Sequence, residues 1–169
     1  MKEIKAIVVD DEKFGREQIK SLLKRYFQQV DLVAEAADAV EALRQIYFHK
    51  PDLVFLDIEM PDKGGFEMLE NIQEHDFEII FVTAYDQYAL KAIKFSALDY
   101  LLKPVNKEEF KSAINKFLDK RKNAYDRKSV INNFIRNYTS QSTDSFRLAV
   151  NSALKTFFLL PEEIIRCEA

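Results

Sequence analysis

The chain has 169 residues, of which 47% are hydrophobic and 31% are charged, as in one globular domain with part of a second. Residues 1–118 carry 22 Asp and Glu against 16 Lys and Arg, net −6, whereas residues 119–169 carry 6 against 9, net +3. This composition excludes a membrane protein, because no apolar run approaches the ~18 residues that span a bilayer, and it makes the acidic part a poor nucleic-acid surface. The only cysteine, Cys167, excludes an internal disulfide and fits a cytoplasmic location.

Short, mostly β-branched apolar runs recur along the first two thirds of the sequence and predict β-strands. Longer amphipathic stretches, with apolar residues at helical spacing, separate these runs. Asp38 with Glu41, and Asn106 with Glu109, are typical of capping boxes at the starts of two helices. The predicted strands are residues 4–9, 31–36, 52–56, 78–83 and 97–102.

Strands that alternate with helices indicate βαβ units, which form a parallel sheet covered by helices on both faces. Uninterrupted apolar runs suit strands that are buried on both sides. The units occupy about 118 residues, so we expect one doubly wound α/β domain. Ligands of such sheets bind beyond the carboxyl ends of the strands, where the strand order reverses.

The sequence changes character after residue 118. Residues 119–129 are highly charged and contain neither Pro nor Gly, so they either prolong the fifth helix or form a linker. Residues 130–138 have apolar side chains at helical spacing, as in a short helix or a continuation that packs against a second chain. After a polar joint at 139–145, residues 146–169 are typical of two or three short strands, too little chain for a core of its own.

Polar side chains lie where the predicted strands end. Because the carboxyl ends of parallel strands meet at one edge of a sheet, we expect these side chains to share a pocket. Taken one at a time, the aspartates are equally typical of helix caps, and the lysine of a solvated surface residue. The residues concerned are Asp10 and Asp11 after the first strand, Asp57 after the third, Thr83 at the end of the fourth and Lys103 after the fifth.

Clustered carboxylates raise one another's pKa unless a cation lies among them. Oxygen-only ligands favour a hard cation, so this cluster predicts Mg²⁺, with Mn²⁺ as the alternative. A metal, an ammonium group and a hydroxyl are what a phosphoryl group needs during transfer, and a carboxylate can itself be the nucleophile. Asp57 is the predicted nucleophile, because it ends a central strand and the other groups flank it.

The loop after Asp57 contains Met60-Pro61 and Gly64-Gly65. Pro61 predicts a stiff turn. The glycine pair, with Gly65 as its structural residue, predicts a backbone position with positive φ. Together these residues would shape a loop that leaves the pocket accessible.

Three segments resemble the receiver domain of bacterial two-component response regulators: VVDDE (8–12), LVFLDIEMPDKGGFE (53–67) and FVTAYDQYALKAIKFSALDYLLKPV (81–105). The resemblance covers residues 4 to about 120 and implies a flavodoxin-like (βα)5 fold with strand order 2-1-3-4-5. It implies that Asp57 accepts a phosphoryl group from the phosphohistidine of a sensor histidine kinase. It also implies self-phosphorylation and slow self-dephosphorylation rather than the turnover of an enzyme.

The resemblance assigns a role to each residue around Asp57. Asp11 and Asp57 would bind Mg²⁺ through their side chains. Asp10 would act through water, and Glu59 would bind the metal through its backbone carbonyl.

Further roles implied by the resemblance fall near the fourth and fifth strands. Lys103 would pair with the phosphoryl oxygens, and its bond to Pro104 would be cis. Thr83 and Tyr100 are similar to the family's switch pair: the Thr83 hydroxyl would move toward the phosphoryl group, and Tyr100 would turn into the vacated space. This would reshape the face formed by the fourth helix, the fifth strand and the fifth helix, and promote homodimerisation. Without the resemblance, Tyr100 is a half-buried strand aromatic.

The second half of the chain carries a resemblance of its own. DQYALKAIKFSALDYLLKPV (86–105) is similar to receivers that precede LytTR DNA-binding domains, with Ser96 in place of the more usual Gly, and KTFFLLPEEIIRCEA (155–169) resembles the first strands of a LytTR domain. We therefore expect a receiver domain at 1–120, a partly helical linker at 121–145 and an incomplete start of a DNA-binding domain at 146–169. The DNA-contacting segments of that family would follow Ala169.

Three functions are open on the sequence alone. The favoured one is a phosphorylation-controlled transcription factor of LytTR type, which binds paired DNA half-sites as a dimer. The second is a relay or protein-binding switch without DNA output. The third is a Mg²⁺-dependent phosphatase or phosphotransferase in which Glu59 is the second acid, but no cap domain or separate substrate pocket is evident in the sequence.

Overall fold

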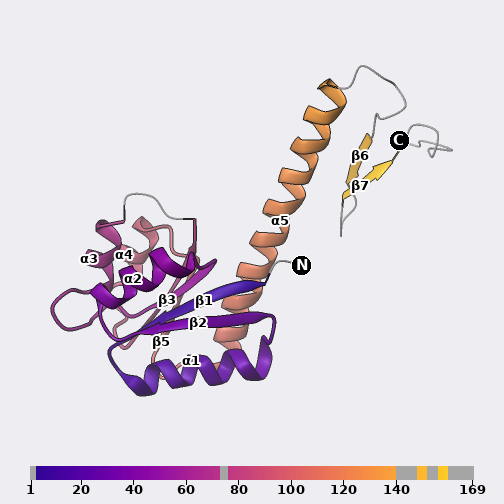
Figure 1. Cartoon of the computed structure of the whole chain (residues 1–169). Coiled ribbons are helices and arrows are strands. Elements are labelled where there is room, and N and C mark those ends of the chain that lie inside the picture. The colour runs from indigo at the N-terminus through magenta and orange to yellow at the C-terminus, as the bar shows by residue number, and fades with distance from the viewer. Residues whose placement is uncertain (1–2, 73–75, 140–147, 152–155, 160–169) are drawn as a thin grey trace. The chain divides into compact units, whose positions relative to one another are not determined.

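A computed structural model of the chain describes residues 3–72, 76–139, 148–151 and 156–159. It divides into two compact units, Met1–Phe117 and Leu118–Ala169, which are described separately. In the first unit, strands alternate with helices from the N-terminus onward (Figure 1). The elements are β1 (Ile4–Val9), α1 (Lys13–Tyr26), β2 (Val30–Ala36), α2 (Ala39–His49), β3 (Leu53–Leu56), α3 (Gly65–Glu70), β4 (Glu78–Thr83), α4 (Ala89–Lys94), β5 (Asp99–Leu102) and α5 (Lys107–Thr139).

The strands β1 to β5 form one sheet in the order β2-β1-β3-β4-β5, and every neighbouring pair is parallel. The predicted α/β fold and strand order are confirmed. The order reverses at β1, which lies between β2 and β3. The carboxyl ends of β1 and β3 are level with each other, because Val9 is the register partner of Leu56.

Side chains of the central strand β3 alternate between two apolar layers. On one face, Val54 and Leu56 belong to the core cluster that includes residues of α2, α3 and α4. On the other face, Phe55 stacks on Phe110 of α5 with ring centroids 5.7 Å apart, and Phe110 meets Phe27 edge-on at 6.1 Å. Figure 1 shows the same division, with α2, α3 and α4 on one side of the sheet. β3 is therefore buried on both sides, as the sequence predicts.

Two predicted helix caps are formed. Asp38 Oδ1 accepts a hydrogen bond from the Glu41 amide at 2.8 Å, and the Glu41 carboxylate accepts one from the Ala37 amide at 3.0 Å. Asn106 Oδ1 accepts a hydrogen bond from the Glu109 amide at 3.3 Å, at the start of α5. Such side-chain acceptors satisfy amides that have no partner inside the helix.

The helix α5 continues into the second unit and ends at Thr139. Residues 119–129 therefore prolong the fifth helix. In the same unit, β6 (Leu148–Asn151) and β7 (Thr156–Leu159) form an antiparallel pair. The predicted strand residue Phe146, and the part of the predicted joint beyond Thr139, lie outside the described residues.

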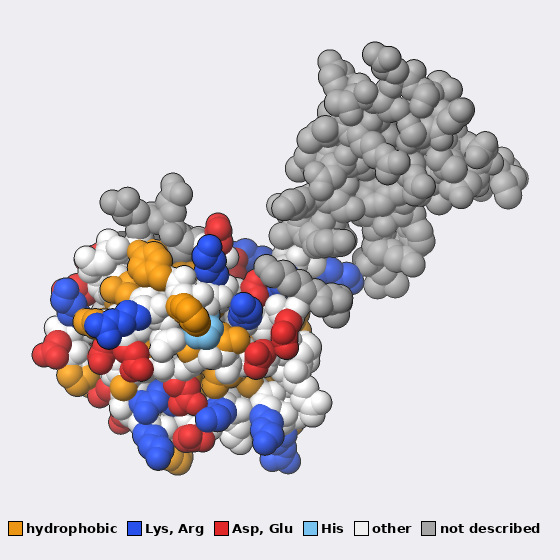
Figure 2. All heavy atoms as spheres, viewed as in Figure 1, with side chains coloured by type: hydrophobic (Ala, Val, Ile, Leu, Met, Phe, Trp, Pro, Cys, Tyr) orange, Lys and Arg blue, Asp and Glu red, His pale blue; other side chains and the backbone are white. Residues whose placement is uncertain are grey.

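One face of the first unit mixes both signs of charge. Figure 2 shows acidic and basic side chains interspersed over the face in view, with hydrophobic side chains among them. Such a face offers a nucleic-acid backbone no continuous basic surface. Within the described ranges, none of the helices is both long enough and apolar enough to span a bilayer.

Candidate functional site

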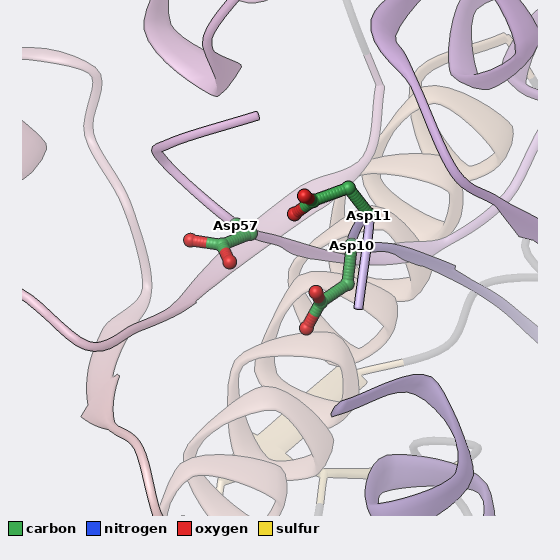
Figure 3. Close-up of side chains that lie close together, drawn as sticks. All are labelled: Asp10, Asp11 and Asp57. Atoms are coloured by element: carbon green, nitrogen blue, oxygen red, sulfur yellow. The ribbon is translucent and has the colours of Figure 1, made fainter. Parts of the chain in front are cut away.

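The ends of β1 and β3 bring three aspartates together. Asp10 and Asp11 follow Val9 directly, and Asp57 follows Leu56. The Asp57 amide donates a hydrogen bond to the Val9 carbonyl at 2.8 Å, which extends the ladder past the last strand residue. One carboxylate oxygen from each of Asp10, Asp11 and Asp57 lies within 4.8 Å of the others (Figure 3).

The donor set of this cluster fits a hard divalent cation. Asp10 and Asp57 are only 2% and 6% exposed, whereas Asp11 is exposed. Three carboxylates at this separation repel one another in a partly buried place, and a cation among them removes the repulsion. Carboxylate oxygens with room for water are the ligands that Mg²⁺ and Mn²⁺ prefer.

Lys103 reaches the same cluster from the loop after β5. Its ammonium lies 2.6 Å from Asp57 Oδ2, 2.9 Å from Asp10 Oδ2 and 2.9 Å from Glu12 Oε2. Burial lowers the pKa of Lys103, but the ion pairs with Asp57, Glu12 and Asp10 outweigh burial and raise the pKa above its ordinary value. The side chain is therefore a fixed cation beside Asp57. Its peptide bond to Pro104 is cis.

The pKa values of two neighbouring acids respond to Lys103 in different ways. Burial raises the pKa of Asp10, although the hydrogen bond from Lys103 opposes the effect. The pKa of Glu12, which is largely solvated, is lowered by its hydrogen bond to Lys103. The buried carboxylate Asp10 is thus costly to ionise without a cation, whereas Glu12 gains from the one that is present.

Thr83 ends β4 beside this pocket, and its side chain is completely buried. Among the described residues, its Oγ1 has no hydrogen-bond partner. Tyr100, on β5, is half-buried, and its hydroxyl donates to the backbone carbonyl of Tyr85 in the loop after β4. The ring of Tyr100 contacts Phe81 at 6.3 Å between centroids. Thus the buried Thr83 hydroxyl, without a hydrogen-bond partner among the described residues, and the hydrogen-bonded Tyr100 lie on the neighbouring strands β4 and β5.

The loop after β3 forms another wall of the pocket. The Glu59 amide donates to Asp57 Oδ1 at 3.3 Å, and the Glu59 carboxylate accepts a hydrogen bond from the Tyr88 hydroxyl at 2.7 Å. The two loops that follow β3 and β4 are therefore linked across the pocket. The cavity measures about 380 Å³ and is lined by Asp11, Glu12, Asp57, Glu59, Met60, Pro61, Ala84, Tyr85 and Lys103.

The expected positive φ at the Gly64-Gly65 pair is wrong, because no glycine in the chain has a positive φ. The left-handed residue of this loop is Asp62, with φ 66°. Gly65 is needed for close approach instead: a Cβ there would lie 2.2 Å from the Asp57 carbonyl oxygen. At Gly64, a Cβ would lie 2.7 Å from the Ile58 carbonyl oxygen. The glycines allow the start of α3 to pack directly on the strand end that carries Asp57.

Of the predicted site residues, the ones that line the cavity are Asp11, Asp57, Glu59, Pro61 and Lys103. Three others contact a lining residue: Asp10 pairs with Lys103, the Thr83 carbonyl accepts from the Lys103 amide, and the Tyr100 hydroxyl donates to the Tyr85 carbonyl. Gly65 and Pro104 do not line the cavity. The sequence interpretation gave no role to Glu12, which pairs with Lys103, or to Arg16, whose guanidinium donates to the Asp10 carbonyl at 2.7 Å. Glu12 shares the strand end with the two aspartates, and this position is a signal for its role. For Arg16 the sequence contains no comparable signal.

The chain is similar to known signalling proteins over this unit. The family model of the response regulator receiver domain matches residues 6–115. An uncharacterized response regulatory protein of Vibrio cholerae is 42% identical over 120 residues, which are 70% of this chain and 50% of that protein. A protein of Bacillus anthracis named sensory transduction protein LytT is 38% identical over 130 residues, 76% of this chain and 52% of that protein. The chain thus spans about half the length of these curated relatives.

A solved structure agrees with the sequence relatives. The receiver domain of AraT, a response regulator from Geobacillus stearothermophilus, superposes with a TM-score of 0.67 at 31% identity, and the match covers 73% of this chain and 98% of that one. The parallel sheet, the acidic cluster at its carboxyl edge and the family match over residues 6–115 agree. The chain therefore belongs to the response regulator receiver domain family.

Proposed function

We propose that Asp57 accepts a phosphoryl group from the phosphohistidine of a sensor histidine kinase, the kind of partner that a receiver domain implies. The observation that supports this most strongly is the position of Lys103, whose ammonium lies 2.6 Å from Asp57 Oδ2 and 2.9 Å from Asp10 Oδ2. A cation shared between a nucleophilic carboxylate and a neighbouring acid is suited to bind an oxygen of an incoming phosphoryl group. Receiver domains are generally non-catalytic signalling modules, so we expect stoichiometric phosphorylation of Asp57 rather than the turnover of an enzyme.

In the proposed step, an Asp57 carboxylate oxygen attacks phosphorus in line with the leaving nitrogen of the phosphohistidine. The new oxygen–phosphorus bond forms as the nitrogen–phosphorus bond breaks, and the imidazole leaves with the bonding electron pair and takes up a proton. Lys103 moves from a carboxylate oxygen to a phosphoryl oxygen. The amide of Glu59, 3.3 Å from Asp57 Oδ1, steadies the attacking carboxylate.

The acidic cluster would bind Mg²⁺, as receiver domains generally do at such a pocket, and Mn²⁺ has the same ligand preferences. Asp11 and Asp57 would be side-chain ligands, Asp10 would act through water, and Glu59 would offer its backbone carbonyl. When bound, the cation neutralises charge that develops on the phosphoryl oxygens. The separation of at most 4.8 Å between carboxylate oxygens supports this assignment.

The unpaired hydroxyl of Thr83 supports a switch role. It is buried without a partner among the described residues, and a phosphoryl oxygen at Asp57 would offer it an acceptor. Movement of Thr83 would open space on its strand, and Tyr100 would pack more deeply into that space. The rearranged α4-β5-α5 face would then dimerise with a second copy of the chain.

The proposed output is transcription regulation through a LytTR-type domain. The relative named LytT is about twice as long as the region it shares with this chain. We assign residues 1–120 to the receiver, 121–145 to a linker and 146–169 to the start of a DNA-binding domain, and the antiparallel strands β6 and β7 support this assignment. DNA contacts would come from residues beyond Ala169. The proposed location of the protein is the cytoplasm. A stop codon directly after Ala169 would favour a relay without DNA output instead.

The substitution Asp57→Asn tests the proposed phosphoacceptor. The unsubstituted chain should gain the mass of one phosphoryl group on incubation with acetyl phosphate and Mg²⁺, and the Asp57→Asn chain should gain none. Asp62→Asn is the matched control, because Asp62 is an exposed carboxylate of the same loop that does not line the cavity. Labelling that persists in Asp57→Asn would contradict the assignment.

A further inference from the structure

Arg16 lies in the first turn of α1, and its side chain turns back toward the loop that carries the acidic pair. Its Nη1 donates to the carbonyl oxygen of Asp10 at 2.7 Å and to that of Asp11 at 3.2 Å. The Arg16 side chain is 16% exposed. One nearly buried cationic group thus binds two successive carbonyls of the segment that presents two candidate metal ligands.

A carboxylate from the neighbouring strand fixes the other edge of the guanidinium. Glu35, on β2, places Oε2 3.5 Å from Arg16 Nε. Glu35 is itself the register partner of Val8, two residues before Asp10. Its second oxygen pairs with Lys20 Nζ at 2.8 Å. Arg16 therefore links Glu35 of the sheet to the loop that carries Asp10 and Asp11.

The loop needs such support, because its native position brings like charges together. Asp10, Asp11 and Asp57 converge to within 4.8 Å. Lys103 offsets the repulsion between Asp10 and Asp57, but the carboxylate of Asp11 still approaches both of them, and this repulsion favours an outward movement of the loop. The backbone orientation at Asp10 and Asp11 determines where each carboxylate points, and a hydrogen bond to the carbonyl of the same residue fixes that orientation. Asp10 has little freedom in its present place: Glu12 N donates to its Oδ1 at 2.9 Å, and a Cβ on Gly15 would lie 2.1 Å from its Oδ2.

We propose that Arg16 is a positioning residue for the divalent cation site, and that Glu35 orients Arg16 for this purpose. Arg16 touches neither the cation nor the phosphoryl group. It fixes the backbone of Asp10 and Asp11 so that their carboxylates already converge before the cation arrives. The inference rests on the proposed cation binding at this cluster, and it adds two residues, one on α1 and one on β2, to the groups that determine the affinity.

Mg²⁺ titration by isothermal calorimetry, without any phosphodonor, tests the inference. Arg16→Met keeps most of the aliphatic stem and removes the guanidinium, and Mg²⁺ affinity should fall by about 10-fold, as is typical when the group that orients a metal ligand is lost. Glu35→Gln should weaken binding in the same direction by a smaller factor. The matched control is Lys20→Met, because Lys20 contacts Glu35 but is 49% exposed and does not touch the loop. Its Mg²⁺ affinity should be unchanged.

A metal-free readout separates positioning from general stability. The Glu12 amide, which donates to Asp10 Oδ1, should exchange its hydrogen faster in Arg16→Met than in the unsubstituted chain, while amides of β3 keep their protection. Arg16→Lys should restore part of the affinity, since an ammonium can donate to one carbonyl but lacks the planar fork.

An Arg16→Met chain that is folded and binds Mg²⁺ as tightly as the unsubstituted chain would overturn the inference. If Arg16→Met does not fold, Arg16→Lys and Glu35→Gln decide, and unchanged affinity in both overturns it. Failure of the unsubstituted chain to bind Mg²⁺ would refute the proposed cation site, and with it this role of Arg16. Binding that is weakened only in the two Arg16 variants would remove Glu35 from the proposal and leave Arg16 in place.

Discussion

Replacement of Thr83 by Val should stabilise the metal-free protein. The Thr83 side chain is completely buried, and its Oγ1 has no hydrogen-bond partner among the described residues. An unpaired buried donor costs about 1–3 kcal/mol, and Val has nearly the same shape without the hydroxyl. We expect a gain near the lower limit, about 1 kcal/mol, which raises the unfolding midpoint by about 2–4 °C for a chain of this length.

The assay is thermal unfolding followed by circular dichroism, because the chain contains no Trp. Val82→Thr is the reciprocal control: Val82 is 3% exposed on the adjacent position of β4, and its new hydroxyl should lower the midpoint. A midpoint that falls or stays unchanged in Thr83→Val would refute the reasoning, since it would mean that Oγ1 has a partner in solution. The same variant should lose the proposed phosphorylation-dependent change in α4-β5-α5, because the Thr83 hydroxyl is the group proposed to respond.

Further predictions concern Gly65 and Lys103. Gly65→Ala should lower the free energy of unfolding in urea by about 1–3 kcal/mol, because the new Cβ would meet the Asp57 carbonyl oxygen; an unchanged urea midpoint would contradict the packing argument. Burial lowers the pKa of Lys103 and its ion pairs raise it more, so the stability that Lys103 adds should be complete below pH ~10.4 and disappear as pH rises through the folded pKa. The difference in unfolding free energy between the unsubstituted chain and Lys103→Met, measured from pH 8 upward, should therefore shrink above pH ~10.4, and a constant difference would count against the ion pairs.

Most of the sheet could be predicted because each strand has a recognisable pattern of apolar residues in its own sequence. Strand β3 is four apolar residues in a row, and this pattern is typical of a strand buried on both faces. Strand β5 begins at Asp99, two residues later than predicted, because Ser96 adopts φ 54° and the Ala97 amide still donates to the Ala92 carbonyl. The apolar residues Ala97 and Leu98, which the sequence pattern assigns to the strand, thus belong to the turn between α4 and β5.

The site was predictable where it depends on strand ends and unpredictable where it depends on contacts between distant elements. Asp57 and Lys103 could be expected to meet, because parallel strands end at a common edge. The need for Gly65 could not be read correctly, because its cause is the close approach of the start of α3 to the Asp57 carbonyl at the end of β3. Arg16 was missed for the same reason, since its partner Glu35 lies on a different strand and its other acceptors are backbone groups.

Because β3 is buried on both faces, it determines which parts of the first unit can open locally. Phe55 stacks on Phe110 below the sheet, and Leu56 belongs to the cluster above it, so both layers must separate before this strand can open. Opening β3 should therefore require nearly global unfolding, whereas the loop after β4 is tied across the pocket by single hydrogen bonds such as that from Tyr88 to Glu59. Asp57, the proposed phosphoacceptor, directly follows this strand. We therefore expect a chemical change at Asp57 to move the surrounding loops while β3 keeps its position.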